Sequence, residues 1–390
     1  MTDTGTTCGD SNRFPDGVAQ TVNFLGKATR VASTQGHDLD SDTVAENEDV
    51  LVNVSNGVGL LTLNRPKTIN SLTHGMVTVV EKALRNWADD DRVHSVLLTG
   101  AGERGLCAGG DVVAIYRSVK DDGGSATRAF WWDEFRLNSY ISTYPKPYVS
   151  VMDGITMGGG VGVGAHGSVR IVTDTTKMGM PEVGIGYVPD VGGTYLLSRA
   201  PGLLGLHAAL TGAPFSGADA IAMGFADHFV PHADLGAFTD AVLNDGVDAA
   251  VSTYATEPPA SNLLAQRHWI DECYARDTVA DVVAELRGHG AGPAADAANH
   301  IASRSPIALA VTLESVRRAG KLDSLNDVLR QEYRVACATL RSHDLVEGIR
   351  ALLIDKDRNP KWSPSSLALF DENDVEAYFA PADPDLTFPE

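Results

Sequence analysis

Basic residues and cysteines are scarce in this sequence, and their scarcity limits the classes of function. The 31 Lys and Arg residues against 51 Asp and Glu residues give a formal charge of -20. Nucleic acids and anionic membrane surfaces bind to a basic face, so we expect neither as a partner. The four cysteines lack C-x-x-C pairs and metal-like spacing with histidine, which disfavours a disulfide framework and structural zinc. We therefore expect a protein of a reducing compartment that has no metal site.

Long apolar runs are also missing. No run approaches the roughly 18 apolar residues that a membrane-spanning helix needs, and no basic segment followed by an apolar one marks a secretory signal. We therefore expect a cytoplasmic protein without a membrane anchor. The chain has 390 residues, of which 43% are hydrophobic, so it can bury a large core in about two domains.

Nucleotide-binding motifs are weak or absent. Gly162 to Gly167 match G-x-G-x-x-G, and Glu182 follows where a ribose-binding acid would stand. In that fingerprint the first glycine turns directly after a strand, whereas Ile155 to Val161 intervene here. No Lys-Ser or Lys-Thr follows a glycine at P-loop spacing. A dinucleotide site is thus a minor alternative, and we expect no cofactor.

Glycine is plentiful, and it is concentrated after a predicted strand. The β-branched run Tyr148 to Met152 predicts a buried strand, Gly158-Gly159-Gly160 follows it, and Val169 to Val172 predict another strand. Three consecutive glycines each cost about 0.5–1 kcal/mol relative to alanine. Close approach of a ligand to the bare backbone would compensate for this cost.

A second glycine-rich segment, residues 100–111, follows the predicted strand Val93 to Leu98. Asp111 can cap a helix that begins at Val112, because its side chain can accept from the unpaired first amides. Small residues before a helix leave amide N–H groups open to a polarised carbonyl. Either segment alone could be a simple turn. Two of them, each after a buried strand, favour an oxyanion hole.

The remaining patterns divide the chain into three parts. Residues 1–46 are rich in Thr, Ser, Gly and Asp and predict a mobile N-terminal extension. Residues 47–245 predict an α/β core, which begins with a hairpin turning at Asn56-Gly57 and a helix starting at Thr73. Residues 246–390 alternate Ala-rich and charged stretches and predict a helical region that covers the core.

Several sequence blocks resemble the crotonase superfamily, whose members act on acyl-CoA thioesters. They are Asn64 to Lys67, Leu106 to Asp111, Gly154 to Gly162 and Met180 to Glu182. Val188 to Gly193 and Glu347 to Asp357 are similar to the hydrolase branch of that superfamily. The resemblance covers residues 50 to 380. It implies a ββα superhelical core with a C-terminal helical region, an acyl-CoA substrate, a possible homo-oligomer and, in a eukaryote, the mitochondrial matrix.

The resemblance also assigns roles to residues. It implies that Glu182 is the working carboxylate, as nucleophile or general base, and that Asp190 is the second acid of the hydrolase branch. It places the oxyanion hole at the backbone amides of Ala108 and Gly159, and Glu134 at the hydroxyl group of the acyl chain. Further substrate-binding positions are Gly109, Gly110, Asp111 and Lys67.

The sequence departs from hydratases of the superfamily at Gly162, where these usually carry a second glutamate. Without that glutamate, addition of water to a double bond loses one of its two acid-base groups. Thioester hydrolysis is therefore the favoured reaction. A hydratase- or isomerase-like enzyme and a non-catalytic acyl-CoA-binding protein remain as alternatives. Cys107 and His166 are expected to be structural, and Arg350, Lys356 and Lys361 are candidates for contacts with the CoA phosphates.

Overall fold

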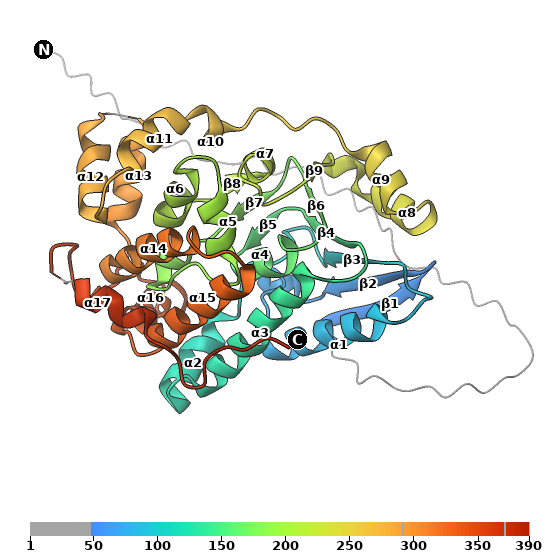
Figure 1. Ribbon diagram of the computed structural model, residues 1–390, viewed down its shortest axis with the longest axis horizontal. Helices are drawn as coiled ribbons and strands as arrows, with labels where there is room; N and C mark the ends of the chain where they lie inside the picture. Colours follow the sequence, from blue (N-terminus) through green and yellow to red (C-terminus); the bar gives the residue numbers. More distant parts are fainter. Residues whose placement is uncertain (1–47, 291, 370–371, 390) are drawn as a thin grey trace, which may run out of the picture. The chain divides into compact units, whose positions relative to one another are not determined.

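The computed structural model describes residues 48–290, 292–369 and 372–389 (Figure 1). Residues 45–390 form one compact unit. The predicted extension, residues 1–46, lies outside the described residues, so its mobility stays a prediction.

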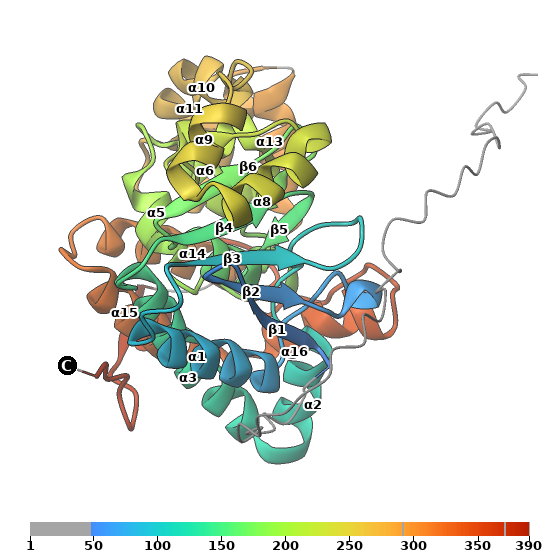
Figure 2. The ribbon, with the colours of Figure 1, turned by 90° about the vertical axis from the view of Figure 1, so that its right-hand side faces the viewer.

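A six-stranded sheet forms the centre of this unit. Its strands are, in spatial order, β1 (Val50–Ser55), β2 (Val58–Leu63), β3 (Ser95–Gly100), β4 (Tyr148–Met152), β6 (Val169–Val172) and β9 (His228–Phe229). Figure 2 shows β1, β2, β3, β4 and β6 following one another in this order. The β1–β2 pair is antiparallel and all other pairs are parallel. The predicted hairpin turn is confirmed: Asn56 and Gly57 have φ of 51° and 78°, as a two-residue hairpin turn requires.

Alternation along the strands sends side chains into two apolar layers. On β3, for example, Val96 and Leu98 pack on the side of α1 (His74–Ala88) and α3 (Ser125–Ser142), whereas Leu97 packs on the opposite side. That opposite layer is covered by α8 (Leu235–Asn244) and α9 (Val247–Tyr254). The central strands are thus buried on both faces, as parallel strands usually are.

A second, three-stranded sheet carries the glycine-rich segment. It consists of β5 (Ile155–Met157), β7 (Lys177–Gly179) and β8 (Phe215–Ser216). Strands β5 and β7 are parallel, with Met157 opposite Gly179. The residues that follow these two strands therefore emerge at the same edge of the sheet.

Local capping signals set several helix starts as predicted. The Thr73 side chain accepts from the Met76 N–H to start α1, and Asp111 accepts from the Ala114 N–H to start α2 (Val112–Asp122). The other helices before residue 246 are α4 (Gly159–Gly164), α5 (Gly193–Arg199), α6 (Leu204–Thr211) and α7 (Gly217–Ala222). The turn after β7 is a 3₁₀ helix, η2 (Glu182–Ile185).

Beyond β9 the described chain is built of helices and connections. These helices, after α9, are α10 (Asn262–Ala265), α11 (Arg267–Tyr274), α12 (Val279–Gly288), α13 (Pro293–Ala302), α14 (Pro306–Ala319), α15 (Leu325–Thr339), α16 (His343–Ile349), the π-helical turn η4 (Arg350–Ile354) and α17 (Glu372–Glu376). Among the described residues, no helix combines the length and apolar character that a membrane span requires.

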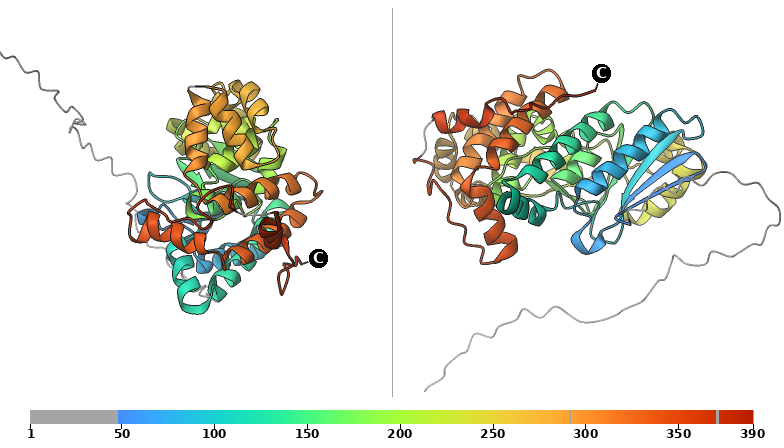
Figure 3. Two further views of the ribbon diagram at one scale, coloured as in Figure 1. Left: turned by 90° about the vertical axis from the view of Figure 1, so that its left-hand side faces the viewer. Right: turned by 90° about the horizontal axis from the view of Figure 1, so that it is seen from below.

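The last of these helices pack on the core. Helix α14 contacts α5 and α6, α15 contacts α3, and α16 contacts both α2 and η2. Figure 3 shows helices α14 to α17, orange to red, gathered away from the blue β1–β2 hairpin. The predicted α/β core with a C-terminal helical region is therefore confirmed. The exact division at residue 246 stays a prediction.

Candidate active site

Three chain segments run parallel into one edge of the small sheet. Cys107 forms a parallel bridge with Thr156, and the Met157 N–H donates to the Cys107 carbonyl at 2.9 Å. On the other side of β5, the Gly158 N–H donates to the Gly179 carbonyl at 3.3 Å. The segments that continue from these pairs carry the predicted oxyanion residues and Glu182. The register of the small sheet thus brings them together.

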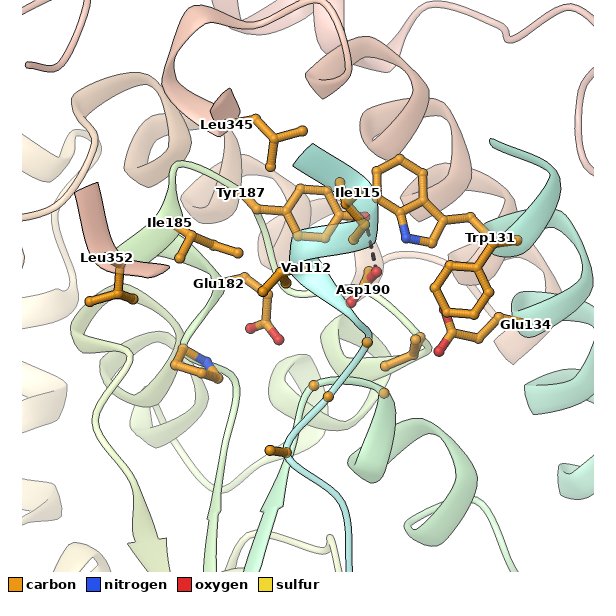
Figure 4. Close-up of a pocket in the computed structure, with 18 residues that line it drawn as sticks. Val112, Ile115, Trp131, Glu134, Glu182, Ile185, Tyr187, Asp190, Leu345 and Leu352 are labelled. Carbon is orange, nitrogen blue, oxygen red and sulfur yellow. Dashed lines mark hydrogen bonds between the residues drawn. The ribbon is translucent and has the colours of Figure 1, made fainter. Parts of the chain in front are cut away.

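A cavity of about 190 Å³ lies at this edge. It is lined by Ala108, Gly109, Gly110, Val112, Ile115, Phe130, Trp131, Glu134, Gly158, Gly159, Pro181, Glu182, Ile185, Tyr187, Asp190, Val191, Leu345 and Leu352. In Figure 4 the carboxyl groups of Glu182, Asp190 and Glu134 lie across this pocket. Leu345 and Leu352 belong to α16 and η4, so the C-terminal region closes part of the wall.

The structure corrects one of the two predicted oxyanion donors. The Ala108 N–H already donates to the Ile69 carbonyl at 2.9 Å, so it is not available to a substrate. Leu72 pairs with the residues on either side of Gly110. The Leu72 N–H donates to the Gly109 carbonyl, and the Asp111 N–H donates to the Leu72 carbonyl. This pairing leaves the Gly110 N–H itself without a backbone partner among the described residues. Gly110 therefore replaces Ala108 as the candidate donor.

The second donor, Gly159, is the first residue of α4, where amides have no partner within the helix. A Cβ atom built on Gly159 would lie 3.4 Å from the Gly110 nitrogen, so the two residues lie at one gap in the cavity wall. The same atom would lie 2.8 Å from Glu134 Oε1. At Gly160 a Cβ atom would come within 2.5 Å of the Cys107 carbonyl. The Cys107 backbone therefore explains the glycine at 160, the Glu134 and Leu72 side chains explain that at 159, and a left-handed φ of 49° explains that at 158.

Glu182 begins the turn η2 and is buried, with 7% of its surface exposed. Its Oε2 atom has no hydrogen-bond partner among the described residues. A Cβ atom built on Gly158 would lie 2.9 Å from its Oε1 atom, so the carboxyl group stands over the glycine backbone. Burial and the nearby Asp190 carboxylate raise the pKa of Glu182 well above its ordinary value. A carboxyl group of raised pKa suits proton transfer near neutral pH.

Asp190 is buried beside Tyr187, whose hydroxyl donates to Asp190 Oδ2 at 2.9 Å. Burial raises the pKa of Asp190 to about 7, although this hydrogen bond lowers it. The Tyr187 ring stacks on Trp131 with 5.2 Å between ring centroids and 6° between planes. This stacked pair fixes the hydroxyl that orients Asp190.

Glu134 lies on α3 and is buried, with 2% of its surface exposed. Its Oε1 atom has no partner among the described residues. Burial and the Asp190 carboxylate raise the pKa of Glu134 well above its ordinary value. Its carboxyl group is placed to contact a polar group of a bound acyl chain.

Two of the predicted substrate-binding residues lie outside the cavity wall. Asp111 caps α2 and accepts from the Arg65 guanidinium at 3.1 Å, so a structural role accounts for it. Lys67 is exposed, and the Arg104 guanidinium holds its backbone by donating to the carbonyls of Pro66 and Lys67. Contact of Lys67 with substrate remains a prediction.

Neighbouring side chains fill the space beside Gly162, where hydratases of the superfamily usually carry their second glutamate. Gly162 lies inside α4, and a Cβ atom there would be 2.7 Å from the Val191 side chain and 2.9 Å from Asn138 Nδ2. A larger side chain at Gly162 would therefore displace two buried neighbours. Because Gly162 lies inside a helix and does not form the turn after a strand, the G-x-G-x-x-G match has no dinucleotide geometry.

The other side chains considered from the sequence are accounted for. Cys107 is buried, which raises its pKa to about 12, and half-buried His166 donates from Nε2 to the Val191 carbonyl at 2.8 Å. Arg350 forms ion pairs with Glu347, Asp355 and Asp357, which leaves it poorly placed for a phosphate. The Lys361 ammonium donates to Asn359, and Lys356 is exposed. Lys356 therefore stays a candidate for a phosphate contact.

Sequence analysis missed Tyr187, Trp131 and Glu332 as parts of the site. Tyr187 lies three residues before Asp190, and this spacing could have indicated a contact. Trp131 precedes Glu134 by three residues on α3, which places both on one helix face. Glu332 lies on α15, and no local signal connects it with the loop that it contacts.

Comparisons with known proteins agree with this geometry. Residues 58–379 match the enoyl-CoA hydratase/isomerase family. The chain is 38% identical to the mitochondrial 3-hydroxyisobutyryl-CoA hydrolase of Danio rerio, over 92% of this chain and 96% of that protein. It is 37% identical to 3-hydroxyisobutyryl-CoA hydrolase 1 of Arabidopsis thaliana, over 86% and 92% respectively.

Solved structures also resemble the chain. A structure described as a carnitinyl-CoA dehydratase from Mycobacterium thermoresistibile is 72% identical in sequence, with a TM-score of 0.86. The alignment covers 88% of this chain and 99% of the chain in that structure. A second structure, described as an enoyl-CoA hydratase from Rhodobacter sphaeroides, is 40% identical in sequence, with a TM-score of 0.83. The alignment covers 87% of this chain and 100% of the chain in that structure. All of the predicted sequence blocks except Asn64 to Lys67 contribute residues to the cavity. The family match over residues 58–379 shows that this chain belongs to the enoyl-CoA hydratase/isomerase family, the crotonase superfamily.

Proposed function

We propose that the protein hydrolyses the thioester of 3-hydroxyisobutyryl-CoA, a reaction of valine degradation, to 3-hydroxyisobutyrate and CoA. The observation that carries this proposal is the grouping of Glu182, Asp190 and Glu134 around the amides of Gly110 and Gly159. The relatives named 3-hydroxyisobutyryl-CoA hydrolases, which align over most of the chain, support the same activity.

The reaction would begin with the thioester carbonyl in the gap between Gly110 and Gly159. Two fixed N–H donors stabilise the charge that develops on the carbonyl oxygen, each by on the order of 3 kcal/mol. Deprotonated Glu182 then attacks the carbonyl carbon or removes a proton from the attacking water. CoA leaves as the thiol after taking up a proton, and Asp190 is placed to move that proton. Glu134 accepts a hydrogen bond from the hydroxyl group of the substrate.

Dehydration of an acyl-CoA is a second candidate, because the 72% identical protein is described as a carnitinyl-CoA dehydratase. Hydration and dehydration in this superfamily usually employ a second glutamate at the position of Gly162. Here Val191 and Asn138 occupy the space that such a side chain would need. Asp190 or Glu134 would have to take over the acid-base role of the missing glutamate, so hydrolysis is the better supported reaction.

Two parallel assays separate these reactions. Release of free thiol from 3-hydroxyisobutyryl-CoA measures hydrolysis, and the absorbance of an enoyl-CoA formed from carnitinyl-CoA measures dehydration. We expect thiol release to be the faster reaction by at least about 100-fold in kcat/KM, a difference of roughly 2.7 kcal/mol in the barrier. Enoyl-CoA formation without thiol release would overturn the proposal, and absence of both would favour a non-catalytic acyl-CoA-binding protein.

A single turnover in heavy-oxygen water distinguishes the two roles of Glu182. If Glu182 is the nucleophile, a mixed anhydride forms, and opening at the enzyme's carboxyl carbon places the label in Glu182. If Glu182 is a general base, the label enters the acid product. Mass analysis of both the protein and the product therefore assigns the role.

The cellular compartment and the oligomeric state of the protein are further proposals. The Danio rerio and human relatives are named as mitochondrial proteins. By analogy, we propose the matrix for a eukaryotic source and the cytoplasm otherwise. A homo-oligomer is expected from the family resemblance, and light scattering of the purified protein would test it.

A further inference from the structure

A buried carboxylate of the C-terminal region holds the turn that follows Asp190. Glu332, on α15, is 1% exposed and lies outside the cavity wall. Its Oε2 atom accepts from the Gly192 N–H at 2.7 Å. Its Oε1 atom accepts from the N–H and the hydroxyl of Thr194, at 2.9 and 2.6 Å. Both carboxylate oxygens thus accept from the N-terminus of α5, at its N-cap residue Gly192 and its second residue Thr194.

Among the described residues, the charged group that shifts the pKa of Glu332 is the like-charged Asp190. Burial raises the pKa of Glu332 to about 8, and the Asp190 carboxylate adds to this rise. A buried carboxylate needs hydrogen-bond donors or a counter-ion, because removal from water is costly. Here the donors of Gly192 and Thr194 fulfil this need, so Glu332 and the turn are mutually dependent.

The turn itself is in a conformation that requires external support. Val191 and Gly192 have φ of 53° and 77°, both left-handed. This region is unfavourable for a β-branched residue such as Val191 and persists only where the surroundings impose it. Three contacts hold it: the Gly193 N–H donates to the Asp190 carbonyl at 2.6 Å within the turn, His166 Nε2 donates to the Val191 carbonyl, and Glu332 accepts from the Gly192 N–H. Asp190 lies immediately before this pair and lines the cavity.

We propose that Glu332 is a positioning residue for the hydrolytic reaction: by fixing Gly192 and Thr194, it sets where the Asp190 carboxyl group stands relative to Glu182. This inference rests on the proposed function. It assigns to the C-terminal helical region a part in the geometry of catalysis as well as in covering the core.

The first test replaces Glu332 by glutamine. In Glu332→Gln one acceptor oxygen becomes an NH₂ group that faces an N–H donor, so the turn relaxes. A displacement of about 1 Å in a reacting group lowers turnover by roughly 100-fold. We expect kcat for 3-hydroxyisobutyryl-CoA to fall about 10- to 100-fold and KM to stay within about twofold, because ground-state binding is retained.

Asp219→Asn is the matched control. Asp219 is also buried, at 4% exposure, and accepts from the Ser261 hydroxyl and the Leu263 N–H, but it lies outside the cavity wall. Its variant should lower the melting temperature and leave kcat unchanged. A fall in stability without a fall in kcat for folded Glu332→Gln would overturn the proposal.

A double variant separates positioning from general destabilisation. Once Asp190→Asn has removed the group that Glu332 positions, adding Glu332→Gln should lower kcat by less than about twofold further, because coupled residues are non-additive. Additive losses would overturn the inference. Thr194→Val, which removes the 2.6 Å bond without changing side-chain shape, should lower kcat in the same direction.

If both Glu332→Gln and Thr194→Val fail to fold, the role of Glu332 is structural and the inference is wrong. Failure of the proposed function has a different signature. In that case the unaltered protein itself releases no thiol from 3-hydroxyisobutyryl-CoA.

Discussion

The carboxyl group of Glu182 is buried, lies over Gly158 and has an oxygen without a partner among the described residues. We predict that Glu182→Gln lowers kcat for thioester hydrolysis by at least about 1,000-fold, because an amide is neither a useful base nor a nucleophile. The dissociation constant for acyl-CoA should change little, since glutamine keeps the shape of glutamate. Thiol release and calorimetric titration with 3-hydroxyisobutyryl-CoA measure the two quantities. Near-normal turnover by this variant would refute the assigned role.

The three neighbouring carboxyl groups predict an unusual pH dependence. Burial and Asp190 raise the pKa of Glu182, and the reactive form is the deprotonated one. Activity should therefore be lost as pH falls through this raised pKa, well above the range of about 4–5 for ordinary carboxyl groups. Asp190→Asn removes the like charge, so the acidic limb of its residual kcat/KM should move to lower pH.

This prediction is checked by kcat/KM profiles of both proteins, with circular dichroism at each pH as the control for unfolding. An acidic limb that stays in place or moves to higher pH in Asp190→Asn would show that Asp190 does not act on Glu182.

At the scale of the structural elements, the start of α4 leaves little room for a side chain at Gly159. In Gly159→Ala the new methyl group would enter the gap shared with the Gly110 N–H and approach Glu134 Oε1. We predict a fall in kcat of about 100-fold or more, the loss typical of one oxyanion donor. The substrate KM should change much less. The control is Gly236→Ala in α8, where a Cβ atom meets no atom within 4 Å. Equal losses in kcat and in affinity for CoA would contradict an oxyanion role.

The start of α2 gives a test of Asp111. We predict that Asp111→Ala lowers the free energy of unfolding by about 0.5–2 kcal/mol, because the cap of α2 is lost. The ion pair with the half-buried Arg65 adds at most about 1 kcal/mol. Asp111→Asn, which keeps an acceptor oxygen, should retain most of the stability. Denaturant unfolding and KM are the measurements. A raised KM with unchanged stability would restore the substrate-binding role that the family resemblance implies.

At the scale of the whole molecule, the C-terminal helices complete both the core and the cavity. Leu345 and Leu352 line the cavity, and α15 contributes Glu332 to the Asp190 turn. We predict that residues 48–245 alone give no soluble hydrolase, whereas deletion of residues 1–40 leaves turnover within about twofold. Residues 1–40 lack the periodic apolar residues that would join a core, so we expect the core to fold without them. Soluble yield, circular dichroism and thiol release are the measurements. A folded, active 48–245 fragment would be the contrary result.

Local signals in the sequence were sufficient for much of the fold. The Asn56-Gly57 turn, the caps at Thr73 and Asp111, and strands β2, β4 and β6 follow from residue types next to one another in the chain. The sequence blocks around Glu182 and Gly158 also indicated the family correctly. Strands β5 and β7, of three residues each, carry too little pattern to be predicted.

The tertiary structure decided which polar groups are free and which are held. Whether an amide can bind substrate depends on carbonyls distant in sequence. The Ile69 carbonyl accepts from the Ala108 N–H, whereas Leu72 pairs on either side of Gly110 and leaves the Gly110 N–H without a backbone partner among the described residues. In the same way, Glu332 holds Gly192 from 140 positions away. Hydrogen bonds between distant segments depend on the register of strands and the packing of helices. The sequence determined the family and the carboxyl and glycine residues of the cavity, whereas its aromatic wall and the role of each backbone donor were determined only by folding.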